Sequence, residues 1–180
     1  MMKLSTLCYI ERGGCYLMLH RVKKQHDVNE GKWIGVGGKL ETDESPEECI
    51  AREVMEETGL TLVHPRMRGL LTFISPGWDS EYIFLYTAQA QGELTQDCNE
   101  GDLRWVPLSD VPQLNLWQGD RIFLDLLLKT DEFFSLKFIY DGDNMVYCAL
   151  NGEDITTKAL GETKCCLLYT SPSPRDPKTS

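Results

Sequence analysis

Four glutamates lie close together in the chain, and three of them are spaced to share one face of a helix. Glu53 and Glu57 are four residues apart, Glu56 lies between them, and Glu44 precedes all three. Carboxylates at this spacing repel one another on a solvated helix by roughly a few tenths of a kcal/mol per pair. A divalent cation would relieve the repulsion. Oxygen ligands favour Mg²⁺ or Mn²⁺ over zinc, which prefers His or Cys.

The residues around this cluster predict a helix that places the glutamates. Ser45 is the expected N-cap, Pro46 the first helical residue, and Glu48 the partner that completes a capping box. Gly59 ends the helix, because glycine readily adopts the positive φ of a C-terminal cap. The apolar face that we expect to meet the core consists of Ile50, Ala51, Val54 and Thr58.

A glycine-rich segment precedes the helix. Residues Trp33–Leu40 read as a short strand that breaks into a turn containing Gly37 and Gly38. Glycines allow a backbone to approach a ligand closely and expose its carbonyl and amide groups. A main-chain carbonyl is therefore a candidate ligand beside the carboxylates.

Gly38, Glu44 and the run Arg52–Leu60 (REVMEETGL) match the Nudix box at every fixed position, so the chain resembles the Nudix hydrolases. The alternative for this stretch is an acidic helix with a solvated face. The resemblance implies that Glu53, Glu56, Glu57 and the Gly37 carbonyl bind the metal, and that Arg52 orients a glutamate. It also implies an enzyme that hydrolyses phosphoanhydride bonds of nucleotides.

Hydrolysis of a phosphoanhydride requires neutralised phosphoryl oxygens, an in-line water and a base. Glu53 is the favoured base, with Glu56 or Glu100 as alternatives. Glu100 is also a candidate metal ligand from a loop outside the box, or else a solvent-exposed charge. Substrate phosphates are expected to contact Arg21, Gly38 and Lys39, although a solvated surface role is the alternative for each cation.

The layout of residues 3–155 resembles the MutT-type oxidised-purine nucleoside triphosphatases. The resemblance implies that Trp117 stacks on the purine and that Asp120 reads its edge, whereas core packing is the alternative for Trp117. Gly119 and Ile34 depart from the pattern, which has an aspartate and an asparagine there. The implied reaction converts a purine nucleoside triphosphate such as 8-oxo-dGTP to its monophosphate and pyrophosphate, an 8-oxo-dGTP diphosphatase activity with a role in DNA repair. The alternatives are a nucleotide sugar or dinucleotide substrate, or a catalytically silent nucleotide-sensing module.

Strands are expected on both sides of two helices, which predicts an α/β (α+β) fold with a mixed sheet sandwiched between helices, the Nudix arrangement. The expected strands are Leu4–Ile10, Cys15–Arg21, Arg66–Ser75, Glu81–Ala90, Leu103–Val106, Phe133–Tyr140 and Met145–Leu150. The second helix is expected at about Asp120–Lys129, and the polar residues 23–32 are expected to form a loop near the site entrance.

Length and charge limit the class of protein. The 180 residues predict one domain, residues 1–163, and a net charge of −10 argues against a nucleic-acid partner. We expect the segment 164–180, which contains Ser-Pro-Ser-Pro, to be a non-native or disordered tail. No apolar run approaches a membrane span, no signal-peptide pattern follows Met1, and the seven cysteines show no metal-binding spacing, so we expect a cytoplasmic protein with reduced thiols and no membrane partner. The oligomeric state has no signature in the sequence.

Overall fold

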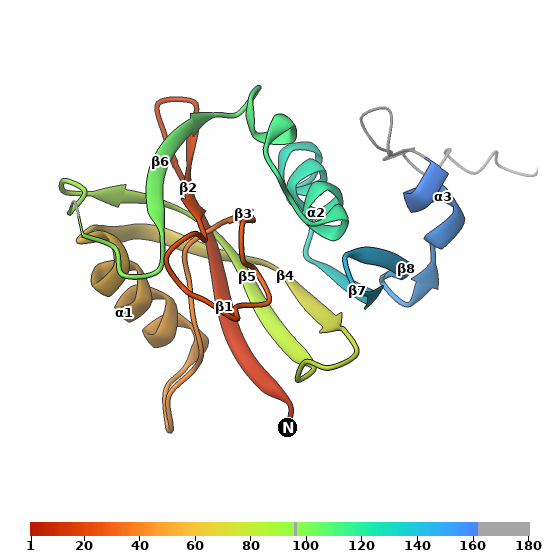
Figure 1. Cartoon of the computed structure of the whole chain (residues 1–180). Coiled ribbons are helices and arrows are strands. Elements are labelled where there is room, and N and C mark those ends of the chain that lie inside the picture. Colours follow the sequence, from red (N-terminus) through yellow and green to blue (C-terminus); the bar gives the residue numbers. More distant parts are fainter. Residues whose placement is uncertain (96, 162–180) are drawn as a thin grey trace, which may run out of the picture.

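A computed structural model describes residues 1–95 and 97–161 of the chain (Figure 1). The strands in this part are β1 (Lys3–Arg12), β2 (Cys15–His20), β3 (Trp33–Ile34), β4 (Thr61–Ile74), β5 (Glu81–Gln91), β6 (Asp102–Pro107), β7 (Phe134–Asp141), β8 (Asn144–Leu150) and β9 (Glu153–Asp154). The helices are α1 (Pro46–Thr58), the 3-10 turn η1 (Val111–Gln113), α2 (Gln118–Lys129) and α3 (Thr156–Gly161).

These strands form one mixed sheet in the order β3-β2-β1-β5-β4-β7-β8-β9, and β6 also pairs with β2. The first strand, β1, lies near the centre: it runs parallel to β5 and pairs antiparallel with β2 at its far end. Strand β4 likewise has one antiparallel neighbour, β5, and one parallel neighbour, β7. Parallel pairs need crossover connections, and these carry the helices.

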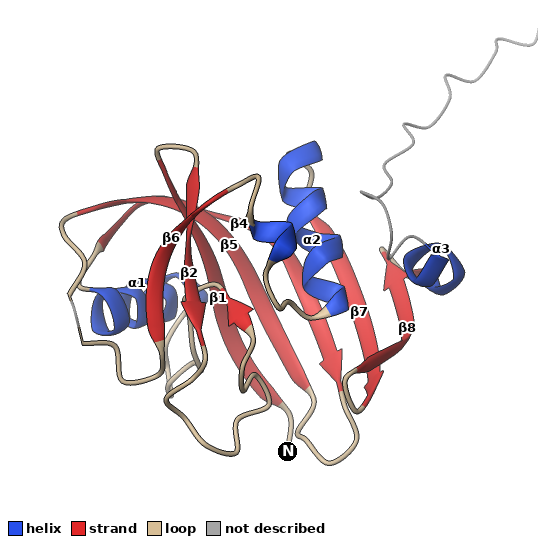
Figure 2. Ribbon diagram, turned by 45° about the horizontal axis from the view of Figure 1, so that its top comes forward, coloured by secondary structure: helices blue, strands red, loops and turns tan. Residues whose placement is uncertain are grey.

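The helices cover opposite faces of the sheet, so the molecule has three layers (Figure 2). Successive residues of β1 show this directly. Cys8 and Ile10 pack into one core with Ile50 and Val54 of α1. Tyr9, which points the other way, packs into a second core with Phe123 of α2. The alternation follows from the two-residue period of a strand, and the predicted sandwich of a mixed sheet between helices is confirmed.

Several predicted boundaries were wrong. The second helix begins at Gln118, β4 begins at Thr61 well before Arg66, and β9 and α3 were not predicted. Ala51 is exposed, and the neighbouring Cys49 is buried in its place. The cysteines in the described part of the chain are free thiols, as expected. The predicted tail 164–180 lies outside the described residues, as do residues 162 and 163 of the predicted domain.

Candidate active site

The caps predicted for α1 are present and fix where its glutamates begin. Ser45 Oγ accepts a hydrogen bond from the Glu48 amide at 3.1 Å, and the Ser45 amide donates to Glu48 Oε2 at 2.8 Å. At the other end, Gly59 adopts φ = 74° and its amide donates to the Met55 carbonyl. Ile50 and Val54 bury one side of the helix against the sheet. The helix therefore has a fixed rotation, which directs Glu53 and Glu57 toward the preceding loop.

That loop is held between β1 and α1 by contacts that only glycine permits. The Thr6 amide donates to the Gly38 carbonyl at 2.8 Å, so the loop lies against β1. A Cβ atom added to Gly37 would lie 2.0 Å from the Thr6 carbonyl oxygen. A Cβ atom added to Gly38 would lie 2.4 Å from Cδ of Glu53. The glycines thus bring the main chain into contact with the first glutamate of the cluster.

Arg52 ties three acidic side chains to one guanidinium group. It donates to both Glu44 carboxylate oxygens, from Nε at 2.7 Å and from Nη2 at 3.0 Å. Its Nη1 donates to Glu53 at 2.8 Å and to Glu56 at 3.2 Å, and its Nη2 also reaches the Lys39 carbonyl. These bonds lower the pKa of Glu44 to about 2. Bidentate, charge-assisted pairing of this kind fixes the orientation of a carboxylate.

Glu57 lies in a different environment from its neighbours. Its side chain is buried, and its Oε2 atom has no hydrogen-bond partner in the described part of the chain. Burial, and then the nearby Glu53 carboxylate, raise the pKa of Glu57 to about 8, against the opposing effects of Arg21 and the Gly37 amide. A buried oxygen without a partner is costly for a folded chain. A cation bound at this oxygen would remove that cost, so the residues fit a hard metal ion.

The three helical carboxylates that the sequence predicted to converge differ in exposure, because Glu57 is buried and Glu56 lies at the solvent side. The Glu56 side chain is 60% exposed and pairs with Arg52. Within residues 1–95 and 97–161, no three His, Cys, Asp or Glu side chains are gathered into a metal-binding group. Arg52 Nη1 donates to one oxygen each of Glu53 and Glu56 and so holds these two carboxylates near each other, while Glu57 is the buried carboxylate beside Glu53.

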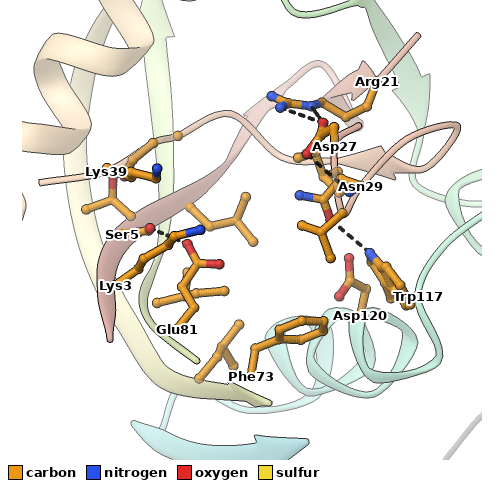
Figure 3. Close-up of a pocket in the computed structure, with 18 of the residues that line it drawn as sticks. Lys3, Ser5, Arg21, Asp27, Asn29, Lys39, Phe73, Glu81, Trp117 and Asp120 are labelled. Carbon is orange, nitrogen blue, oxygen red and sulfur yellow. Dashed lines mark hydrogen bonds and ion pairs between the residues drawn. The ribbon is translucent and has the colours of Figure 1, made fainter. Parts of the chain in front are cut away.

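A cavity of about 500 Å³ opens beside this cluster, and it brings together most of the residues that the sequence singled out (Figure 3). Those that line it are Arg21, Ile34, Gly37, Gly38, Lys39, Glu53, Glu100, Trp117 and Asp120. The loop 23–32 forms part of the wall through residues 24 and 26–29, as expected. A volume of this size suits a small-molecule ligand such as a nucleotide.

Arg21 is not a free cation in this cavity. Its buried guanidinium group forms an ion pair with Asp27 at 2.6 Å and another with Glu100. Glu100 also pairs with Lys24 at 3.6 Å. The predicted contact between Arg21 and a phosphate therefore has to compete with two carboxylates, and the main role of Arg21 in this geometry is to join the loop 23–32 to the segment before β6. Lys39 is exposed at the cavity edge and remains available.

Trp117 both packs in the core and lines the cavity. It lies edge-on to Phe73 at 5.7 Å and to Tyr140 at 4.9 Å between ring centroids. Its Nε1 donates to Asn29 Oδ1 at 2.9 Å, and the Lys32 ammonium lies 4.7 Å from its ring centroid. The ring is therefore rigidly held at the cavity wall, so the two alternatives for Trp117 are not exclusive.

Asp120 projects into the cavity from the first turn of α2 (Figure 3). Burial raises the pKa of Asp120 to about 8, opposed by Lys32 and Arg121. The preceding position cannot hold a second aspartate without rearrangement. The Gly119 amide donates to Tyr140 Oη at 2.7 Å, and a Cβ atom at Gly119 would lie 2.9 Å from that oxygen and from the Phe138 ring. Asp120 therefore stands without the adjacent partner that the oxidised-purine pattern has.

Other cavity residues were missed by sequence reasoning. They include Lys3, Ser5, Phe73 and Glu81, whereas Asp27 and Asn29 belong to the loop 23–32 that was expected at the site entrance. The first two begin β1, and Phe73 and Glu81 lie at the facing ends of β4 and β5. Glu81 is a charged residue directly after a turn, at the start of an apolar strand. This position could have marked it as a site residue, but a charged residue there is equally typical of a strand end that faces solvent.

A layered mixed sheet with a glycine loop, a capped glutamate helix and a cavity beside it defines the Nudix class. The NUDIX domain model matches residues 1–127, and the chain belongs to this family of hydrolases. It is 30% identical over 140 residues to the uncharacterized Nudix hydrolase YvcI of Bacillus subtilis, covering 75% of this chain and 85% of that protein. It is 27% identical over 146 residues to the oxidized purine nucleoside triphosphate hydrolase of Danio rerio, covering 80% and 90%.

Solved structures agree with this assignment. The MutT protein of Bacillus halodurans superposes with a TM-score of 0.74 at 27% identity, over 84% of this chain and 99% of that one. The MutT protein of Methanosarcina mazei gives a TM-score of 0.63 at 28% identity, over 71% and 94%. None of the helices in the described part of the chain has the length and apolar character that a membrane span requires.

Proposed function

We propose that this Nudix hydrolase is a Mg²⁺-dependent enzyme that cleaves a purine nucleoside triphosphate, including an oxidised one such as 8-oxo-dGTP, to the monophosphate and pyrophosphate. The observation that carries the proposal is the buried Glu57 oxygen without a partner, next to Glu53 at the wall of a nucleotide-sized cavity. Mn²⁺ would satisfy the same oxygen ligands.

The phosphate end of the cavity supplies the groups for hydrolysis. Glu53, Glu56, Glu57 and the Gly37 carbonyl would hold the metal, and Glu100 would add a ligand by exchanging its ion pair with Arg21. When bound, the metal neutralises phosphoryl oxygens and makes a coordinated water more acidic. Glu53 is the base in this scheme, because it lines the cavity and Arg52 fixes its orientation through one oxygen only. Lys39, which lines the exposed edge of the cavity, would contact a phosphate.

The other end of the cavity suits a flat, aromatic base. Trp117 and Phe73 present rigid ring surfaces, and Asp120 presents a carboxyl group that can hydrogen-bond to a base edge. The name of the Danio rerio relative supports an oxidised purine as that base. Removal of such nucleotides from the precursor pool would be the enzyme's contribution to DNA repair.

A panel of nucleotides tests the proposal. The purified protein is incubated with 8-oxo-dGTP, dGTP, a nucleotide sugar and a dinucleotide, with Mg²⁺ or with EDTA, and pyrophosphate and orthophosphate are measured separately. We expect the triphosphates to yield pyrophosphate in the presence of Mg²⁺ and no pyrophosphate in the presence of EDTA. Cleavage of only the sugar or dinucleotide would replace the substrate assignment, and a lack of turnover on every compound would favour a nucleotide sensor.

A further inference from the structure

A second carboxylate faces the base end of the cavity from the wall opposite α2. Glu81 begins β5, and the Ser5 hydroxyl of the neighbouring β1 donates a hydrogen bond to its Oε1. Residues Ser5 and Ile83 are in register across the parallel β1·β5 pair, which places Ser5 two positions beyond Glu81 along the sheet. Ser5 is buried and Glu81 is partly buried. The hydroxyl thus fixes the carboxylate at the cavity wall.

The second oxygen of Glu81 is free to meet a ligand. In the described part of the chain no hydrogen bond or ion pair uses Glu81 Oε2, and Lys3 pairs with Asp79 at 3.5 Å. Figure 3 shows the carboxylates of Glu81 and Asp120 projecting into the cavity from opposite sides, with Phe73 between them. The side chain of Asp120 also has no hydrogen bond or ion pair to another described residue, although its amide donates to the Trp117 carbonyl. Each carboxyl group offers an acceptor oxygen, Asp120 through its carbonyl oxygen even in the protonated form that its raised pKa favours, so two acceptors face each other across an aromatic-lined space.

We propose that Glu81, oriented by Ser5, is a specificity-determining residue that acts together with Asp120 to select a purine with N–H donors on two edges. This inference rests on the proposed function for the identity of the site. It adds a residue on the sheet wall to the recognition of the base, and it gives a physical basis for preferring an oxidised purine.

The chemistry of guanine explains the selection. Guanine has donors at N1 and N2, but its N7 and O6 atoms are acceptors. An acceptor that faces a carboxylate is left without a hydrogen bond, which is costly in a desolvated pocket. In the 8-oxo form, N7 carries a hydrogen and becomes a donor. A pocket with an acceptor oxygen of a carboxyl group on each of two walls therefore pairs with both edges of 8-oxoguanine and with only one edge of guanine.

Binding of product nucleotides tests the inference without relying on catalysis. Titration calorimetry in EDTA compares 8-oxo-dGMP, dGMP and 8-bromo-dGMP, the last of which is substituted at C8 but has no N7–H. The wild-type protein should bind 8-oxo-dGMP about tenfold or more tightly than either of the others, as expected for one added charge-assisted hydrogen bond. Equal affinity for 8-oxo-dGMP and dGMP, or an equal preference for the bromo compound, would overturn it.

Variants then assign the preference to Glu81. Glu81→Gln should reduce the 8-oxo-dGMP to dGMP affinity ratio about tenfold, mainly through weaker 8-oxo-dGMP binding, and Ser5→Ala should reduce it less. Glu11 is an exposed residue of β1 outside the cavity, so Glu11→Gln should keep the wild-type affinity ratio. An unchanged ratio in a folded Glu81→Gln variant would refute the role of this residue.

The two proposals fail in distinguishable ways. If the wild-type protein releases pyrophosphate from purine triphosphates with Mg²⁺ but shows no N7–H preference in calorimetry, only the role of Glu81 is lost. If it binds 8-oxo-dGMP selectively but releases no pyrophosphate, the hydrolytic function is lost and the recognition site stands.

Discussion

Among single residues, Arg52 determines how the glutamates of α1 are held. It contacts Glu44, Glu53 and Glu56 through one guanidinium group. Lysine keeps the positive charge but cannot form this fork of bonds. We predict that Arg52→Lys lowers kcat about tenfold to a hundredfold, the effect of one or two charge-assisted hydrogen bonds, measured as pyrophosphate release with saturating Mg²⁺.

A matched control separates this effect from the loss of any surface ion pair. Arg66 lies on β4, is exposed and pairs with Asp131, and neither residue lines the cavity. Arg66→Lys should keep wild-type kcat. Similar kcat values for Arg52→Lys and Arg66→Lys would show that the fork does not orient the reacting groups.

Because the carboxyl group of Asp120 is buried, the free energy of unfolding is expected to fall as the pH rises. The pKa of Asp120 is about 8 in the folded chain against an ordinary value of 3.8. Between about pH 4 and pH 8 the unfolded chain has lost this proton while the folded chain keeps it. The free energy of unfolding therefore falls as pH rises, by at most about 1.4 kcal/mol per pH unit, and by less because the residue is partly exposed.

We predict that Asp120→Asn removes this decline, because asparagine has no proton to lose. Urea unfolding from pH 5 to pH 8 should show wild-type stability dropping relative to the variant. Asp143→Asn, in the exposed β7–β8 turn, should follow the wild type. If the free energy of unfolding changes with pH in the same way for the wild type and Asp120→Asn, the raised pKa of Asp120 is contradicted.

At the scale of elements, local signals were sufficient for α1 and insufficient for α2. The cap of α1 lies within four residues, so Ser45, Pro46 and Glu48 specify its start from sequence alone. Helix α2 begins after Trp117 without a side-chain cap. Its start is set by contacts to β7 and β8, such as the hydrogen bond from the Met145 amide to Gln118 Oε1 at 2.8 Å. Such contacts join distant residues and leave no local pattern.

The contact between α2 and β7 leads to a prediction about Gly119. Alanine normally stabilises a helix interior relative to glycine by about 1 kcal/mol, and this is an upper bound for Gly119 in the first turn of α2. Here a Cβ atom would lie 2.9 Å from the Phe138 ring and from Tyr140 Oη. We predict that Gly119→Ala lowers the free energy of unfolding by about 1 to 2 kcal/mol, because overpacking outweighs helix propensity. Gly161→Ala in α3, where a Cβ atom meets nothing within 4 Å, should be neutral or stabilising in the same urea assay. A stabilised Gly119→Ala would show that the rings yield readily.

Across the whole molecule, the sheet assembles the cavity from segments far apart in the chain. The Nudix box and the mixed sandwich could be predicted, because they follow from a fixed spacing and from alternating patterns. The burial of Glu57, the ion pairs of Arg21 with Asp27 and Glu100, and the place of Glu81 could not, because each depends on which strands become neighbours. The parallel pairing of β1 with β5 in particular brings residue 5 beside residue 81.

The most direct test of the account is Mg²⁺-dependent turnover of Glu57→Gln compared with the wild type, alongside thermal unfolding of both. Glutamine keeps the size of the side chain and removes the buried charge that a metal would neutralise. We predict that pyrophosphate release falls about a hundredfold or more, since several kcal/mol of metal-based stabilisation are lost. The melting temperature in EDTA should be nearly unchanged, because glutamine has the same size and is neutral, like the protonated carboxyl group that burial favours. Wild-type turnover by a folded Glu57→Gln protein would contradict the assignment of this carboxylate as the centre of the site.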